Sequence, residues 1–361
     1  MDCCGEEGAW KGDASFEFKK VADGVHVAVA APAYKVNCNT AIIENDDGVI
    51  VVDTHSKPSA ARVIVEHLRG LTGKPVRYVV NTHFHWDHWH GNEVYPAAYP
   101  GAEIVTNQIT REAMLLKGLK RIGDHRRQMP GDIAKLEAEV AAATGEARAR
   151  LERELGLARA YRAEVDALKP ALPTIAFEQT MKLYRREREI HFLHLGRAHT
   201  AGDVFVYLPK EKVVITGDAV IGWTPFMGDG YPEDWAGTLD RLAQLDFTHI
   251  VMGHGDVADR GWLRVFRGYV ADMVAAVRED VARGRRSRRD QAARHREAGA
   301  DLREAVLRLR RLPAVARGPG RQRGAHVRDG QLMPGISPLA VGAPAQGSGA
   351  RRSGSRCAVI S

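Results

Sequence analysis

Cysteine is scarce in this 361-residue sequence, and long apolar runs are missing. Of the four cysteines, Cys3 and Cys4 are adjacent and cannot readily pair with each other, so neither a disulfide framework nor a CxxC zinc site is expected. The final "CAVIS" misses the prenylation pattern because Cys357 is fifth from the end. No stretch approaches the roughly 20 apolar residues of a membrane helix, and the first residues lack a signal-peptide pattern. We therefore expect a cytoplasmic protein without a membrane partner.

Lysine is absent from the C-terminal part of the chain, although that part is strongly basic. From Arg283 onward there are 18 arginines against five acidic residues, a local charge of +13, which leaves −6 for the preceding residues out of a total of +7. Nucleic-acid binding needs clustered Lys and Arg beside the site, so nucleic acid is not expected as a partner of the body. Residues 284–361 are predicted to be a disordered tail, because the stretch from "PAVARGPG" onward lacks periodicity, although "RRSRRDQAARHREAGADLREAVLRLRRL" could still form a basic helix. They form either a native arm that contacts nucleic acid or anionic surfaces, or the product of a frame shift after about residue 284.

The rest of the chain alternates short β-rich runs with amphipathic helical stretches. Residues 1–14 are expected to be a flexible leader, and 15–283 one domain. Runs such as "VHVAVA", "NTAIIE" and "VIVVD" predict strands, and "SKPSAARVIVEHLRGLTG" predicts a helix before the strand "VRYVVNT". This alternation is typical of a layered α/β sandwich. Residues 108–168, rich in Ala, Glu, Arg and Leu, predict an inserted set of helices, either a hairpin over a sheet edge, which we favour, or a lid over the site.

Four histidines and an aspartate crowd the segment "NTHFHWDHWHGN", residues 81–92, directly after a predicted strand. His83 and His85 alternate, so in an extended loop both can face one ion, while Asp87 and His88 can turn toward a second. Neutral imidazole and ionised carboxylate are the ligands that zinc and similar ions take. The segment therefore predicts a paired metal site.

Three further candidate ligands each follow a predicted strand: His199 in "GRAHTAGD", Asp218 in "ITGD" and His254 in "VMGHGD". Strand ends at one rim of a sheet are where ligands from distant parts of the chain can meet. We expect these residues to complete the site.

With these motifs the sequence resembles the metallo-β-lactamase-fold hydrolases, over roughly residues 16–282. The resemblance implies an αββα four-layer sandwich with a helical insertion and two divalent metal ions. It also implies an Asp at the bridging position, as in glyoxalase II, where true zinc β-lactamases carry Cys or Ser. The implied ligands are His83, His85 and His199 for one metal, Asp87, His88 and His254 for the other, and Asp218 for both.

The resemblance implies a dinuclear metal-dependent hydrolase. A metal-bridged hydroxide would attack an ester or thioester acyl bond of a small-molecule substrate, and Asp87 would orient the hydroxide and shuttle its proton as a catalytic residue. The alternatives are phosphodiester or nucleic-acid hydrolysis and β-lactam hydrolysis at the same site. Zinc is favoured, but iron and manganese also accept this ligand set. The sequence leaves the substrate and the oligomeric state open.

Residues around the predicted ligands carry weaker signals. Asp53, at the end of a predicted strand, is expected either to hydrogen-bond a ligand imidazole or to cap the following helix. His90 stands where the family has a small residue, and we expect it at the surface. Trp223, Phe226 and Tyr231 either line an acyl pocket or close the core.

Overall fold

The computed structural model describes residues 16–31 and 35–284. The expectations for the leader at 1–14 and for the tail beyond Gly284 concern residues outside this range.

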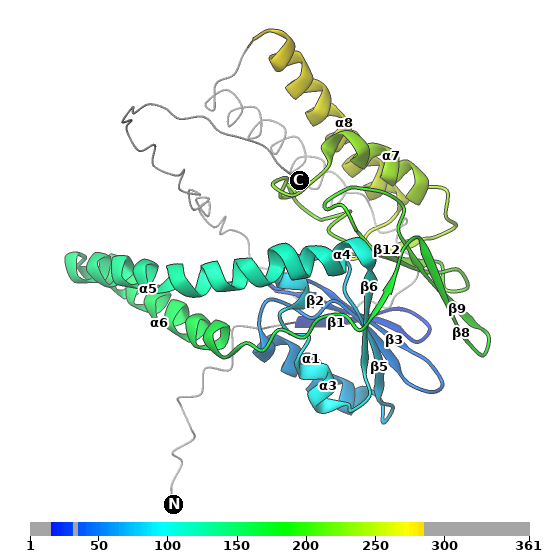
Figure 1. Cartoon of the computed structure of the whole chain (residues 1–361), viewed down its shortest axis with the longest axis horizontal. Helices are drawn as coiled ribbons and strands as arrows, with labels where there is room; N and C mark the ends of the chain where they lie inside the picture. The colour runs from blue at the N-terminus through cyan, green and yellow to red at the C-terminus, as the bar shows by residue number, and fades with distance from the viewer. Residues whose placement is uncertain (1–15, 32–34, 285–361) are drawn as a thin grey trace, which may run out of the picture. The chain divides into compact units, whose positions relative to one another are not determined.

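The first sheet has seven strands in sequence order (Figure 1). Its first four strands pair antiparallel, and the last three pair parallel to their neighbours. Side chains alternate between its faces: in the third strand Ala41 and Ile43 face the second sheet, whereas Ile42 packs toward a helix. The strands are β1 (Phe16–Ala22), β2 (Val25–Ala30), β3 (Thr40–Glu44), β4 (Val49–Val52), β5 (Val76–Val80), β6 (Glu103–Asn107) and β7 (Ile175–Phe177).

The second sheet has five strands in the order β12-β11-β10-β9-β8. Only the β11–β12 pair is parallel. In β11, Val213 and Ile215 face the first sheet, and Val214 faces the opposite side. The strands are β8 (Thr180–Arg185), β9 (Arg188–Leu193), β10 (Phe205–Leu208), β11 (Val213–Gly217) and β12 (His249–Met252).

Helices cover the outer faces of both sheets. Ile64 and Tyr95 pack on the first sheet, and Trp235 and Phe266 pack on the second. A separate apolar cluster fills the space between the sheets. The predicted αββα sandwich is therefore confirmed. The covering helices are α1 (Pro58–Leu71) and α3 (Val94–Ala98) on one side, and α7 (Pro232–Leu242) and α8 (Arg260–Ala282) on the other.

The helical insertion runs from Gln108 to Ala167, and its long hairpin projects from the sandwich (Figure 1). Its first helix contacts β6 and β7 at the sheet edge. The following turns pack Met114 and Ile122 against Trp89 in the loop after β5. One part of the insertion thus lies at the sheet edge, and the next part lies beside the histidine-rich segment. Its elements are α4 (Gln108–Ala113), the π-helical turn η1 (Met114–Gly118), α5 (Leu119–Ala142) and α6 (Gly145–Ala167).

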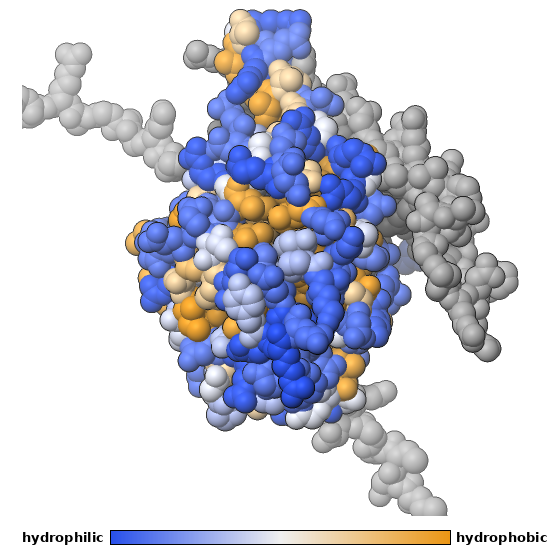
Figure 2. All heavy atoms as spheres, turned by 90° about the vertical axis from the view of Figure 1, so that its right-hand side faces the viewer, coloured by the Kyte–Doolittle hydropathy of each residue, from blue (hydrophilic) through white to orange (hydrophobic). Residues whose placement is uncertain are grey.

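No helix in the described part of the chain combines the length and the apolar character needed to cross a lipid bilayer. Seen from the side of β8 and β9, the surface is mostly hydrophilic, with hydrophobic side chains gathered in a few groups (Figure 2).

Candidate metal centre

The histidine-rich segment leaves the end of β5 and enters a short helix, α2 (Trp86–Trp89). His83 lies in a bend and His85 has extended backbone directly before α2, whereas Asp87 and His88 lie on its first turn. All four are buried, with at most 8% of each residue exposed. The change to helical backbone turns the two pairs of side chains in different directions.

The three other predicted residues reach the same place from the second sheet. His199 lies in the loop after β9, Asp218 directly follows β11, and His254 lies just beyond β12. At Gly253 a Cβ atom would stand 1.9 Å from Asp218 Oδ1. Only glycine therefore lets these two strand ends approach so closely.

The first cluster joins His83, His85 and His199, whose ligand atoms lie within 4.8 Å of one another. His199 Nε2 is 2.9 Å from His85 Nδ1. His83 Nε2 is buried and has no hydrogen-bond partner among the described residues. A buried imidazole nitrogen without a partner is unfavourable unless something else, such as a metal ion, binds it.

The second cluster joins Asp87, His88 and His254. His254 Nε2 lies 3.1 Å and His88 Nε2 lies 3.6 Å from Asp87 Oδ2. Nitrogen and oxygen ligands of a tetrahedral zinc ion, each about 2.0–2.1 Å from it, stand about 3.3 Å apart. The spacing in this cluster therefore fits a metal ion.

Asp218 stands between the two clusters. Its Oδ1 is 3.3 Å from His88 Nε2. Its Oδ2 is 3.5 Å from His254 Nε2 and 3.6 Å from His199 Nε2. One carboxylate thus faces imidazoles of both clusters, so the structure brings all seven predicted residues together. Their role as metal ligands stays a prediction.

Charge differs between the clusters in the metal-free protein. Burial lowers the pKa of His199 to about 3 and that of His83 well below its usual range. Burial also disfavours charge on His254, but the carboxylates of Asp218 and Asp87 outweigh it and raise its pKa to about 9. Since metal ligands must be deprotonated, a metal ion that binds the second cluster displaces this proton.

Asp53 forms a hydrogen bond with His88 of the second cluster. Its Oδ2 accepts a hydrogen bond from His88 Nδ1 at 2.8 Å, and it also accepts from the Thr82 backbone N–H and hydroxyl. Its φ of 65° is a left-handed conformation that costs free energy in a non-glycine residue. The capping alternative is wrong, because α1 begins at Pro58 with Lys57 as its N-cap.

Asp229 was not among the residues predicted from the sequence. His85 Nε2 lies 2.9 Å from Asp229 Oδ2, across 144 residues of chain. Arg121 of the insertion donates to both oxygens of the same carboxylate. Neither residue belongs to a motif, so only the folded chain reveals their link to the site.

Two expectations for the surrounding residues resolve clearly. The surface position expected for His90 is wrong: only 6% of the residue is exposed, because it lies beside Trp86 and Trp89 under the insertion. Trp223 and Phe226 do not close the core, since 46% and 61% of them are exposed. Their rings lie against His254 and His85, at the mouth of the metal centre.

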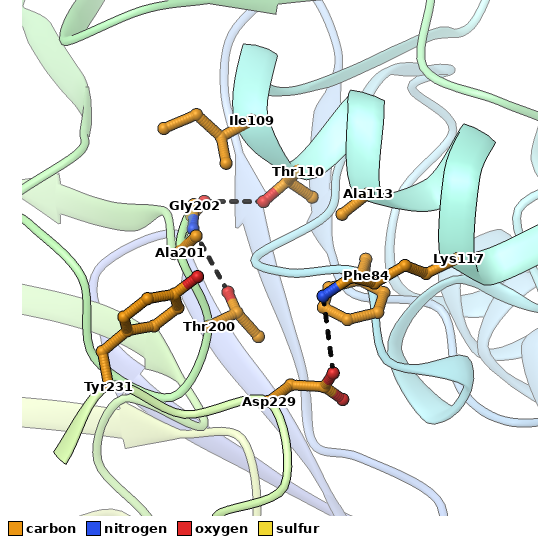
Figure 3. A pocket seen from close by; sticks show the side chains of 10 residues that line it. All are labelled: Phe84, Ile109, Thr110, Ala113, Lys117, Thr200, Ala201, Gly202, Asp229 and Tyr231. Carbon is orange, nitrogen blue, oxygen red and sulfur yellow. Dashed lines mark hydrogen bonds and ion pairs between the residues drawn. The ribbon is translucent and has the colours of Figure 1, made fainter. Parts of the chain in front are cut away.

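A small pocket lies beside the centre, between the insertion and the loop after β9 (Figure 3). Its cavity volume is about 30 Å³. Phe84 and Lys117 line one side, and Thr200 and Tyr231 line the other. Asp229 joins the pocket to the metal centre through His85.

A sequence model of the metallo-beta-lactamase superfamily matches residues 33–254, more than half of the chain. The chain belongs to the metallo-beta-lactamase superfamily. Members of this superfamily are metal-dependent hydrolases. The match ends at His254, the last of the seven predicted ligands, and the superfamily resemblance of the sequence is confirmed.

Individual relatives are distant. The linear primary-alkylsulfatase of Pseudomonas sp. (strain ATCC 19151) is 24% identical over 256 residues, which cover 67% of this chain and 46% of the alkylsulfatase. Metallo-beta-lactamase type 2 of Elizabethkingia meningoseptica is 28% identical over 78 residues, or 20% of this chain and 31% of that protein. The chain thus spans less than half the length of these two relatives.

Solved structures support the fold. A metallo-beta-lactamase from Pontibacter korlensis superimposes with a TM-score of 0.53 at 17% identity, covering 71% of this chain and 99% of that one. At this identity the likeness concerns the fold alone.

Proposed function

We propose that this chain is a dinuclear metal-dependent hydrolase that cleaves ester or thioester acyl bonds of a small-molecule substrate. The observation that carries the proposal is the position of Asp218, whose two oxygens face imidazoles of both clusters at 3.3–3.6 Å. His83, His85 and His199 would hold one ion, and Asp87, His88 and His254 the other. A carboxylate shared between them is the glyoxalase II-like arrangement.

The bound metal ions would lower the pKa of water toward neutrality and polarise the carbonyl oxygen of the substrate. Around them the side chains have separate tasks. Asp87, with 10% of its side chain exposed, presents a carboxylate oxygen that can accept a proton from the attacking water. Asp53 holds His88 through Nδ1 and so leaves His88 Nε2 free to bind metal.

The exposed rings of Trp223 and Phe226 fit the acyl substrate proposed here. They flank the centre at the histidines of opposite clusters, with ring centroids 4.9 Å from His254 and 5.6 Å from His85. Apolar side chains left exposed beside a polar site indicate a surface that a ligand covers. An acyl chain of moderate length would bury them.

Sulfate-ester hydrolysis is a second candidate, and the similarity to the alkylsulfatase favours it. The same two metal sites would bind the sulfate oxygens, and the apolar rim would contact an alkyl chain. β-Lactam hydrolysis is supported by the short match to a metallo-beta-lactamase, but Asp218 stands where zinc β-lactamases carry Cys or Ser. Zinc is the proposed metal, with iron or manganese as alternatives, and a cytoplasmic location stays a prediction.

Metal analysis combined with a substrate panel tests the proposal. The panel contains a thioester, a lactone, an alkyl sulfate, a phosphodiester and a cephalosporin. We expect two metal ions per chain and the highest rate on the thioester or lactone. Preferred cleavage of the alkyl sulfate would replace the acyl substrate with the second candidate.

Asp218→Ala is the informative variant, and Asp246→Ala, at an exposed ion pair with Lys212, is its control. Because Asp218 would contact both ions, we expect its loss to remove at least one metal ion per chain and to lower the rate by about 100-fold or more. Unchanged metal content together with unchanged rates would contradict the proposal.

A further inference from the structure

The Asp229 carboxylate links the metal centre to the helical insertion. Its Oδ2 lies 2.9 Å from His85 Nε2, and its two oxygens each accept a hydrogen bond of 2.8 Å from the Arg121 guanidinium. Lys117 Nζ lies 3.7 Å from Asp229 Oδ1. Only 7% of the Asp229 side chain is exposed, so these partners replace most of its solvent.

Half of the Arg121 side chain is exposed, but it lies in a part of the insertion that packs on the site. Its guanidinium carbon lies 5.1 Å from the centre of the Phe84 ring. Phe84 stands in the sequence between two predicted ligands, His83 and His85. One turn earlier, Gly118 packs so closely on Trp89 that an added Cβ would lie 2.9 Å from the indole ring. The buried Ile122 follows directly. A bidentate arginine in such a setting fixes the orientation of the carboxylate that it binds.

The orientation of Asp229 decides which nitrogen of His85 can bind metal. His85 Nδ1 faces His199 Nε2 inside the first cluster, whereas His85 Nε2 points outward to Asp229. A carboxylate acceptor at Nε2 holds the proton there and leaves the lone pair on Nδ1 for a metal ion. Partners of this kind also orient the ring.

We propose that Arg121 is a positioning residue of the first metal cluster, and that it acts through Asp229 on His85. The helical insertion then contributes to metal affinity as well as forming a wall of the site. This inference rests on the proposed function, because it takes His85 as a metal ligand.

Metal affinity, measured by competition with a chromophoric chelator, tests this relay in folded variants. We expect Asp229→Asn to weaken binding at the first cluster by about 10–100-fold, as is usual for a lost partner of a ligand histidine. Arg121→Met should weaken it by about 3–10-fold, because Asp229 remains but loses its orientation. In the double variant the effect should match Asp229→Asn alone within about twofold, since the two residues act in series.

Arg127→Met is the matched control, because the exposed Arg127 lies on the same helix and forms an ion pair with Asp124 instead of Asp229. With cobalt in place of the native metal, the ligand-field spectrum should change in Arg121→Met and stay as in the wild type in Arg127→Met. Equal affinities and spectra for these two variants would overturn the relay, as would additive effects in the double variant. The relay can fail while the proposed function stands, which is the result if the wild type still binds two metal ions and hydrolyses its substrate. A wild type that binds no metal would overturn both.

Discussion

Side chains of the candidate metal centre depend on neighbours that are not among the seven predicted ligands. His88 is held by Asp53, and His85 by Asp229. The side chain of Asp218 can lie against the end of β12 only because Gly253 has no side chain. At this scale the site is a set of candidate ligands whose ring orientations are held by hydrogen bonds, and a metal ion needs oriented ligands for tight binding.

Asp203 gives a pH-dependent prediction for the metal-free protein. Burial raises its pKa to about 7, even though Thr200 donates two hydrogen bonds to it. Because the folded protein keeps this proton longer than the unfolded chain, the stability that it contributes is present below about pH 4 and is lost as the pH rises through about 7.

We expect Asp203→Asn to reduce this pH dependence, since an amide does not titrate. Urea unfolding at pH 5 and at pH 7.5 measures it: the wild type should lose more free energy of unfolding between the two values than the variant. Equal losses would show that Asp203 is ionised throughout this range.

Sequence reasoning found ligands that sit in motifs and missed the residues that orient them. His83, His85, Asp87 and His88 fall within six positions, so their chemistry is visible without a structure. Asp229 and Arg121 are 108 residues apart, and their pairing depends on how the insertion folds back. His90 was misplaced for the same reason, because the sequence does not show what the insertion covers.

Among the elements, the π-helical turn η1 packs closely on the segment that carries the candidate ligands. Both Lys117 and Arg121 point from this region to Asp229, four residues apart on one helical face. The strands rich in β-branched residues were predictable from the sequence, and so was the amphipathic helix α1, because its apolar residues recur at helical spacing. The π turn was not, because one extra residue in a helical turn leaves no pattern in the sequence.

Gly118→Ala tests this packing, with Gly131→Ala in the following helix α5 as its control. A Cβ at Gly118 would lie 2.9 Å from the buried Trp89 ring, whereas one at Gly131 meets nothing within 4 Å. Alanine favours a helix over glycine by about 1 kcal/mol, and overpacking costs about 1–3 kcal/mol. We therefore expect Gly131→Ala to raise the melting temperature and Gly118→Ala to leave it unchanged or lower it. A similar rise in both variants would show that the insertion can shift away from Trp89.

For the whole molecule, both sheets and their covering helices lie between Phe16 and Ala282. The last helix, α8, ends in a regular way: Gly284 has a φ of 68°, and its N–H donates to Val281. A glycine in this conformation is a common helix terminator. All four layers are thus formed by residues before this point.

A chain that ends at Gly284 should therefore keep the melting temperature, metal content and activity of the full chain. A chain that ends at Asp259 loses α8 and with it the buried Phe266 and Val270, so it should not fold. Circular dichroism and metal analysis of both truncations check this. A folded but inactive chain ending at Gly284 would mean that later residues take part in the site.

Anomalous diffraction from crystals of the metal-loaded protein tests the central claim most directly. Seven side chains from distant parts of the chain are expected to bind two metal ions. We predict one peak among His83, His85 and His199 and a second among Asp87, His88 and His254, with Asp218 in contact with both. Metal peaks elsewhere in the protein, with none at these two clusters, would contradict the account.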